Sequence, residues 1–202
     1  MSPRHRTTAE TVERLLDTAL AVYARDGREG FTMSAVIKES GVSSGSLYHH
    51  FGSFDGLAAA LYTRCMTALL ESMATAIEAC TDAREGVEAA ARAYLDFAAT
   101  RRTEAEFIHA SAYAAFLPAH ASSIAEAKGP LLARMMAWIR PHIASGEVVD
   151  LSPVLLEMLL VGPVAETTRR WLAGAPGLDL AEASARLPER IWCSLSLGGG
   201  AV

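Results

Sequence analysis

Apolar residues recur every three or four positions along most of the chain, the spacing of amphipathic helices. The first such stretch follows Thr7-Thr8-Ala9-Glu10, where a hydroxyl precedes a carboxylate by three residues and so fits a helix capping box. Gly27 and Gly30 are expected to end this helix. Two short helices, at 33–40 and 44–51, follow, and a longer one is predicted from Ser53 to about Thr81.

Further helices are predicted near residues 84–101, 104–116, 122–145, 153–173 and 180–196. The prolines near predicted breaks are Pro118, Pro130, Pro153 and Pro176. The prolines inside helical patterns, which should kink or interrupt them, are Pro141, Pro163 and Pro188. No segment alternates as a β-strand does. The pattern therefore predicts an all-α fold.

The composition is that of a soluble globular protein: 202 residues, 51% hydrophobic and 20% charged. The N-terminus lacks the apolar segment of a signal peptide, and the longest apolar run, near 153–165, is interrupted by Glu157 and is too short to span a bilayer. The three cysteines lie far apart, without metal-ligand spacing. We expect a cytoplasmic, reduced protein with no membrane contact, bound metal or cofactor.

The stretch "SGVSSGSLYHHFGSF", at 40–54, differs from the Ala- and Leu-rich chain around it. Gly41 is expected to end one short helix and Ser43 or Ser44 to cap the next, which gives the dimensions of a helix-turn-helix motif. Leu47 and Phe51 would then form the buried face of the second helix. Its other face would present Ser44, Gly45, Ser46, His49 and His50.

Those exposed residues suit contact with an anionic groove. Small residues allow a close approach, and serine hydroxyls can bond base edges or phosphates. The free N–H groups of a helix N-terminus also favour phosphate. The rings of Tyr48, His49 and His50 can reach the sugar-phosphate backbone. The charge balance is weak evidence against nucleic-acid binding, because the net charge is −5 and residues 1–60 hold six basic and seven acidic residues. The basic residues Arg4 and Arg6 are, however, grouped on the leading arm.

The segment from Phe31 to Tyr62 resembles the DNA-binding region of the TetR family of bacterial transcriptional repressors. The similarity lies in Gly41-Val42-Ser43, Leu47-Tyr48, His50-Phe51 and Leu57, with a Phe31-Thr32 entry, and it covers roughly residues 8–62. Beyond that, the chain matches the family only in its helical pattern and length. The resemblance implies a three-helix DNA-binding domain at 1–52 and a larger helical domain for ligand binding and dimerisation at 53–202.

The resemblance also implies contacts. Thr32 and Ser34 match positions that touch the DNA backbone or bases; Ser44, Gly45 and Ser46 match base-reading positions; Tyr48, His49 and His50 match the phosphate-clamping run. Two residues depart from the family pattern. Phe54 stands where the family often has a phosphate-binding lysine. Ile37 stands where the family favours alanine at the crossing of the two motif helices, so it needs compensation, which Ser34 or Ser40 would give.

Aromatic residues and methionines on successive helices of the second domain can line an apolar ligand cavity. His109 would orient the ligand; alternatively it is a satisfied or surface histidine. For every other residue in the list that follows, the competing interpretation is that it simply packs in the core. The expected ligand-binding residues are Cys65, Met66, Tyr94, Phe97, Phe107, His109, Tyr113, Met135 and Trp138.

The last two predicted helices carry wide apolar stripes that would pair with a second copy in a four-helix dimer interface. The alternative is that they close the core of a single chain. The stripe residues are Leu156, Leu160, Val164 and Trp171 on one helix, and Leu187, Ile191 and Leu195 on the other.

No catalytic sequence motif is present, so an enzyme is not expected. The function that follows is a ligand-responsive repressor, which binds double-stranded operator DNA as a homodimer and is released by a small, apolar effector. The rival interpretation is a dimeric helical ligand-binding or interaction protein whose DNA affinity is weak or lost.

Overall fold

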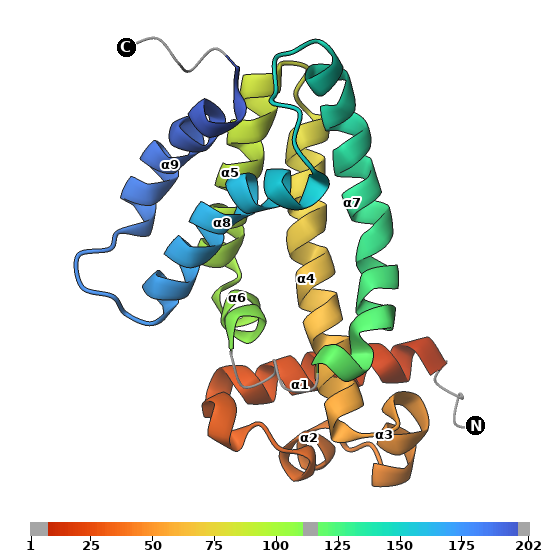
Figure 1. The fold of residues 1–202 in the computed structure, drawn as a ribbon. Helices are drawn as coiled ribbons and strands as arrows, with labels where there is room; N and C mark the ends of the chain where they lie inside the picture. The colour runs from red at the N-terminus through yellow and green to blue at the C-terminus, as the bar shows by residue number, and fades with distance from the viewer. Residues whose placement is uncertain (1–7, 111–116, 198–202) are drawn as a thin grey trace. The chain divides into compact units, whose positions relative to one another are not determined.

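The computed structural model describes residues 8–110 and 117–197, and every named element within them is a helix (Figure 1). The all-α prediction is thus confirmed for this part of the chain. The elements are α1 (Thr8–Gly30), α2 (Met33–Ser40), α3 (Ser44–Phe51), α4 (Phe54–Glu78), α5 (Ala83–Thr100), α6 (Arg102–His109), the 3-10 helix η2 (Leu117–His120), α7 (Ala121–Ala144), α8 (Pro153–Leu172) and α9 (Leu180–Leu195).

Two compact units divide the described residues. The first holds those up to 65 and from 110 to 125; the second holds 66–109 and those from 126 onward, so α4 contributes to both. The predicted boundary between 52 and 53 does not coincide with this division. The reason is that the start of α4 is built into the first unit: Leu57 and Leu61 are fully buried, and the Phe54 ring lies 5.0 Å from the Phe31 ring.

The core of the first unit begins with the apolar stripe of α1. Leu15, Ala19 and Val22 are fully buried, and the Tyr23 ring meets Phe31 edge-on at 5.9 Å. Gly27 adopts a φ of 64° inside α1, yet the helix continues to Gly30. The prediction that Gly27 ends the helix is therefore only partly correct, because the chain bends there and resumes helical hydrogen bonding.

In the second unit, α5 packs against α8, α9 and α6, and α8 packs against α9. The buried side of α5 is rich in small residues, among them Gly86, Ala90, Ala91 and Ala98, which let neighbouring elements approach closely. α7 is tied to α4 by Arg134, whose guanidinium bonds both Glu71 at 2.8 Å and Glu78 at 2.6 Å.

Prolines interrupt the helices less than expected. α7 continues through Pro130 and Pro141, α8 through Pro163 and α9 through Pro188. The predicted break at Pro130 is wrong. Gly129 and Gly162 precede two of these prolines, and a glycine has no Cβ to clash with the following proline ring. Pro153 instead occupies the first turn of α8, where its missing N–H costs no helical hydrogen bond.

We predict that Gly86→Ala destabilises the protein by roughly 1–3 kcal/mol, the usual cost of overpacking. An ideal Cβ at Gly86 would lie 2.2 Å from the Trp138 ring, so the indole or α5 must shift. Urea unfolding measures the loss. In a Trp138→Leu background the same change should cost little or become favourable, because alanine is the better helix former. Equal costs in both backgrounds would contradict this contact.

Candidate nucleic-acid interface and apolar cavity

The turn between α2 and α3 is fixed by local hydrogen bonds. Gly41 has a left-handed backbone (φ 63°, ψ 16°), and its N–H donates to the Ile37 carbonyl at 3.1 Å. The Ser40 hydroxyl accepts from Val42 N–H at 3.2 Å and donates to the same Ile37 carbonyl at 3.3 Å. The Ser40 hydroxyl thus stabilises the turn and does not make room for the larger side chain of Ile37. Ile37 is only half-buried, and the fully buried residue of α2 is Val36.

Both motif helices begin at hydroxyl caps. Thr32 Oγ1 accepts from Ala35 N–H at 3.3 Å, and Ser43 Oγ accepts from Ser46 N–H at 3.2 Å. Of the two predicted caps for α3, the structure therefore selects Ser43. Ser44 is left as an exposed residue of the first turn.

The faces of α3 are arranged as the pattern predicted. Leu47 is fully buried and anchors the helix, while Phe51 is half-buried. The opposite face is exposed at Ser44, Gly45, Tyr48 and His49, and half-buried at Ser46 and His50. Thr32 and Ser34 are also exposed, with their hydroxyl oxygens 3.2 Å apart. Arg4 and Arg6 lie outside the described residues.

The end of α3 is held by the start of α4. Ser53 Oγ accepts from Gly56 N–H at 2.9 Å. A Cβ at Gly56 would lie 1.9 Å from the Phe51 carbonyl oxygen, so only glycine allows this approach. Sequence reasoning did not single out Gly56, because a glycine inside a helical pattern gives no local signal of what it contacts.

Ion pairs neutralise two cations of the first unit, Arg25 and Arg64. Arg25 bonds Asp26 at 2.7 Å and Glu39 at 2.5 Å, which lowers the pKa of Asp26 and raises that of Arg25. Arg64 pairs with Asp17 at 2.7 Å. Phe54, which replaces the family's lysine, packs on Phe31 and so serves the core. The arrangement offers mostly neutral donors around α3.

An apolar cavity of about 160 Å³ lies within the second unit, between α4, α5, α7 and α8. Met135 and Trp138, two of the predicted ligand-binding residues, line it. The remaining lining residues, none of which is among the expected ligand-binding residues given above, are Ile77, Val87, Leu132, Met136, Ile139, Pro153, Val154, Leu156, Glu157 and Leu160.

The other predicted ligand residues do not line this cavity. Tyr94, Phe97 and Phe107 are buried in the core, and Met66 packs against it, as the alternative interpretation allowed. Cys65 is buried in the first unit. Tyr113 lies outside the described residues. The helix predicted at 104–116 ends at His109 in the structure.

His109 is paired rather than free. Its Nε2 lies 3.1 Å from the Tyr94 hydroxyl. Burial lowers the pKa of His109, and the charge of Arg169 lowers it further, against a smaller opposing effect of Glu166. The imidazole is therefore kept neutral and lies against Tyr94, half-buried, which favours the satisfied-histidine interpretation.

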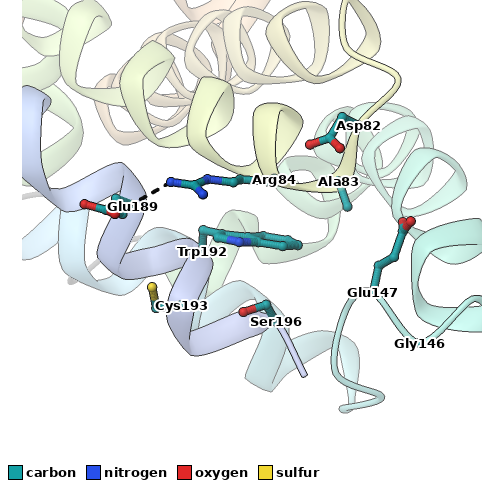
Figure 2. Close-up of a pocket in the computed structure, with 9 residues that line it drawn as sticks. All are labelled: Asp82, Ala83, Arg84, Gly146, Glu147, Glu189, Trp192, Cys193 and Ser196. Carbon is teal, nitrogen blue, oxygen red and sulfur yellow. Dashed lines mark ion pairs between the residues drawn. The ribbon is translucent and has the colours of Figure 1, made fainter. Parts of the chain in front are cut away.

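A second, polar depression of about 370 Å³ lies beside the start of α5 and the end of α9 (Figure 2). Its charged groups already have partners in the chain. Arg84 bonds Glu88 at 2.8 Å and approaches Glu189 at 3.6 Å, Asp82 caps α5, and Glu147 bonds His142 at 2.6 Å. We assign no ligand to this depression.

Most residues predicted for a dimer interface belong to the core of the second unit. The buried ones are Leu156, Leu160, Val164, Ile191 and Leu195, while Trp171 and Leu187 are half-buried. Their stripes face α5 and each other, so the assignment of these buried residues to an outer surface is corrected: they close the core. The exposed apolar residues of α8 are instead Val154, Leu155 and Met158.

Within the described part of the chain, none of the helices combines the length and the apolar character that a membrane span requires. Residues 8–110 and 117–197 also bring together no group of three or more His, Cys, Asp or Glu side chains that could hold a metal ion.

Comparison with known proteins agrees with this geometry. Residues 15–61 match the family described as "Bacterial regulatory proteins, tetR family". The HTH-type transcriptional regulator LmrA of Bacillus subtilis (strain 168) is 36% identical over 78 residues, which are 38% of this chain and 42% of that regulator. The match therefore spans less than half of LmrA.

Two solved structures extend the likeness over the whole fold. A TetR-family transcriptional regulator from Pectobacterium atrosepticum is 26% identical, with a TM-score of 0.69 over 95% of this chain and 98% of that one. The regulator FadR from Bacillus subtilis, solved with stearoyl-CoA, is 20% identical, with a TM-score of 0.70 over 94% and 99%.

The fold and the motif define a helix-turn-helix protein with a separate helical unit. Residues 15–61, within α1 to α4, match the tetR-family model, and the fold as a whole is similar to that of a TetR-family transcriptional regulator.

We predict that His109 makes stability depend on pH. A histidine whose pKa is lowered on folding binds fewer protons in the native than in the unfolded state, so its contribution is present above the unfolded pKa and is lost as pH falls below about 6.5. His109→Gln should flatten the stability profile between about pH 6.5 and 5 relative to the wild type. Urea unfolding across this range measures it; parallel profiles would refute a buried neutral imidazole.

Proposed function

We propose that the chain is a ligand-responsive transcriptional repressor that binds a palindromic operator as a homodimer and is released by a small effector. The observation that carries the proposal is the capped α2–α3 motif, which buries Leu47 and exposes a face of small polar residues and rings. Most of this face is exposed, at Ser44, Gly45, Tyr48 and His49, and so is free to contact another molecule.

α3 is proposed to enter the major groove. Ser44 and Gly45 at its first turn let the backbone approach, and Ser46 offers a hydroxyl to base edges. Tyr48, 48% exposed, and His49 flank them and would bond phosphates, which position the helix without reading sequence. The homodimer would place two copies of α3 about one DNA turn apart, roughly 34–36 Å.

The second candidate, a protein with weak or lost DNA binding, is favoured by the charges around the motif. Arg25 and Arg64 are held in ion pairs, and Phe54 cannot replace a phosphate-binding lysine. The remaining candidates for phosphate neutralisation include Lys38 on α2 and Arg28 on α1, both exposed, and the arm residues Arg4 and Arg6.

Operator binding should separate the two candidates. We expect footprinting of DNA upstream of the protein's own gene to reveal an inverted repeat. If Lys38, Arg4 and Arg6 of both subunits contact phosphates, the slope of log K against log salt should be about −5, and Arg4→Ala with Arg6→Ala should reduce it by about 4. Tyr48→Phe should weaken all sequences alike, and Ser46→Ala should change base preference.

Ser184→Ala on α9 is the matched control and should change neither affinity nor preference. Binding without any palindrome, or with no dependence on salt, would favour the second candidate.

Dimerisation is proposed through the exposed apolar side of α8. Met158 is 63% exposed and Leu155 is 47% exposed, and the two lie about one helical turn apart on α8, outside the lining of the cavity. An apolar cluster of this kind on a soluble protein marks a protein contact.

Met158→Glu is therefore expected to convert dimers into folded monomers in light scattering at micromolar concentration. Leu197→Glu, at a residue that is 64% exposed but lies beyond α9, is the matched control and should leave dimers intact. Glutamate at Leu160 or Ile191 would test the fold instead, since both are buried. A wild-type monomer would exclude the dimer.

The effector site is proposed to be the apolar cavity of the second unit. The stearoyl-CoA bound by FadR does not carry over as a ligand, because no lysine or arginine lines this cavity of about 160 Å³. α4 and α7 each run from one unit into the other, and the far end of α4 contributes Ile77 to the cavity. About 1.4 kcal/mol of coupling along α4 would lower operator affinity tenfold.

A further inference from the structure

The inner wall of the cavity sets the size of the group it accepts. Ile77, Val87, Ile139, Leu156 and Leu160 are buried and form its closed side. Its volume, about 160 Å³, is close to that of an engineered apolar cavity of roughly 150 Å³ that binds benzene. The cavity therefore has room for an apolar group about the size of one aromatic ring.

The mouth of the cavity differs from its wall. Pro153, Val154 and Glu157 are the lining residues that are exposed, and all three come from the first two turns of α8. Glu157 is the one ionisable residue of the lining, and it has no ion-pair partner among the described residues. A ligand in the cavity would therefore meet a carboxylate at the point where it reaches solvent.

The remaining wall residues suit an aromatic group. Met135 and Met136 offer thioether sulfurs, which make favourable contacts with aromatic rings. The indole of Trp138 adds an aromatic ring to the same wall. An anion would meet only Glu157, of like charge, without compensation.

We propose that the effector is a small hydrophobic ammonium compound, whose apolar group fills the cavity and whose positive charge lies at Glu157. This inference rests on the proposed function, which assigns the cavity to the effector. It narrows the chemical class from any apolar molecule to a cationic one.

Three probes of similar size and different charge test the proposal: benzylamine, benzyl alcohol and benzoate. Calorimetry at pH 7 on the full chain, without DNA, measures each affinity. Benzylamine should bind with a Kd on the order of 1 mM, as expected for so small a ligand. Benzyl alcohol should bind more weakly, and benzoate at least tenfold more weakly than benzylamine.

Variants then locate the charge. Glu157→Gln keeps the shape of the mouth and should weaken benzylamine about tenfold, equivalent to about 1.4 kcal/mol, while leaving benzyl alcohol unchanged. Glu182→Gln on α9 makes the same change in net charge away from the cavity and should alter neither. Both residues are exposed, so neither change should impair folding.

Three results would overturn the proposal: benzoate binding as tightly as benzylamine, equal loss of amine affinity in both variants, or no binding of any probe at ten times the expected Kd. Operator binding is measured separately. A failure to bind DNA would refute the repressor without changing the order of the probes, and a wrong order of probes would leave operator binding unaffected.

Discussion

The position of one indole ring, that of Trp138, determines how α7 joins the second unit. Its Nε1 donates to the Cys80 carbonyl at 2.9 Å, across the turn between α4 and α5. The ring occupies the space that a side chain at Gly86 would need, and it packs against His142 at 4.6 Å. Because the same ring lines the apolar cavity, the size of the proposed effector site depends on this contact and on the absence of a Cβ at position 86.

The first unit depends on small residues in a different way. Gly41 supplies a left-handed turn, Ser43 caps α3, and Gly56 allows α4 to begin against the last carbonyl of α3. These requirements are local in sequence. They place α3 by backbone geometry, so its outer residues need not pack against anything. The serines and glycines between 40 and 56 thus serve both the fold and the surface that would approach DNA.

Much of this was predictable, because the signals are local. Helical periodicity and capping residues located most helices, and the Gly41 turn with buried Leu47 identified the motif. The errors concern information that periodicity does not carry. An apolar stripe shows that a face is buried but not which element covers it. The sequence therefore predicts that a second chain covers Leu160 and Ile191, whereas α5 and its neighbours do so. The cavity required knowledge of which helices meet. Glu157 interrupts the apolar run near 153–165, but the sequence alone assigns it no role.

The charges of the first unit bear on how such a motif would discriminate among DNA sequences. Phosphate neutralisation by arginine and lysine supplies affinity that is independent of sequence. Here Arg25 is committed to Asp26 and Glu39, and Arg64 to Asp17. With those cations withdrawn, a larger share of binding must come from backbone N–H groups, serine hydroxyls and the rings of α3. These groups require correct geometry. A motif with few free cations therefore has lower non-specific affinity for DNA, and its binding depends more strongly on the shape and base edges of its DNA site than that of a motif with more free cations.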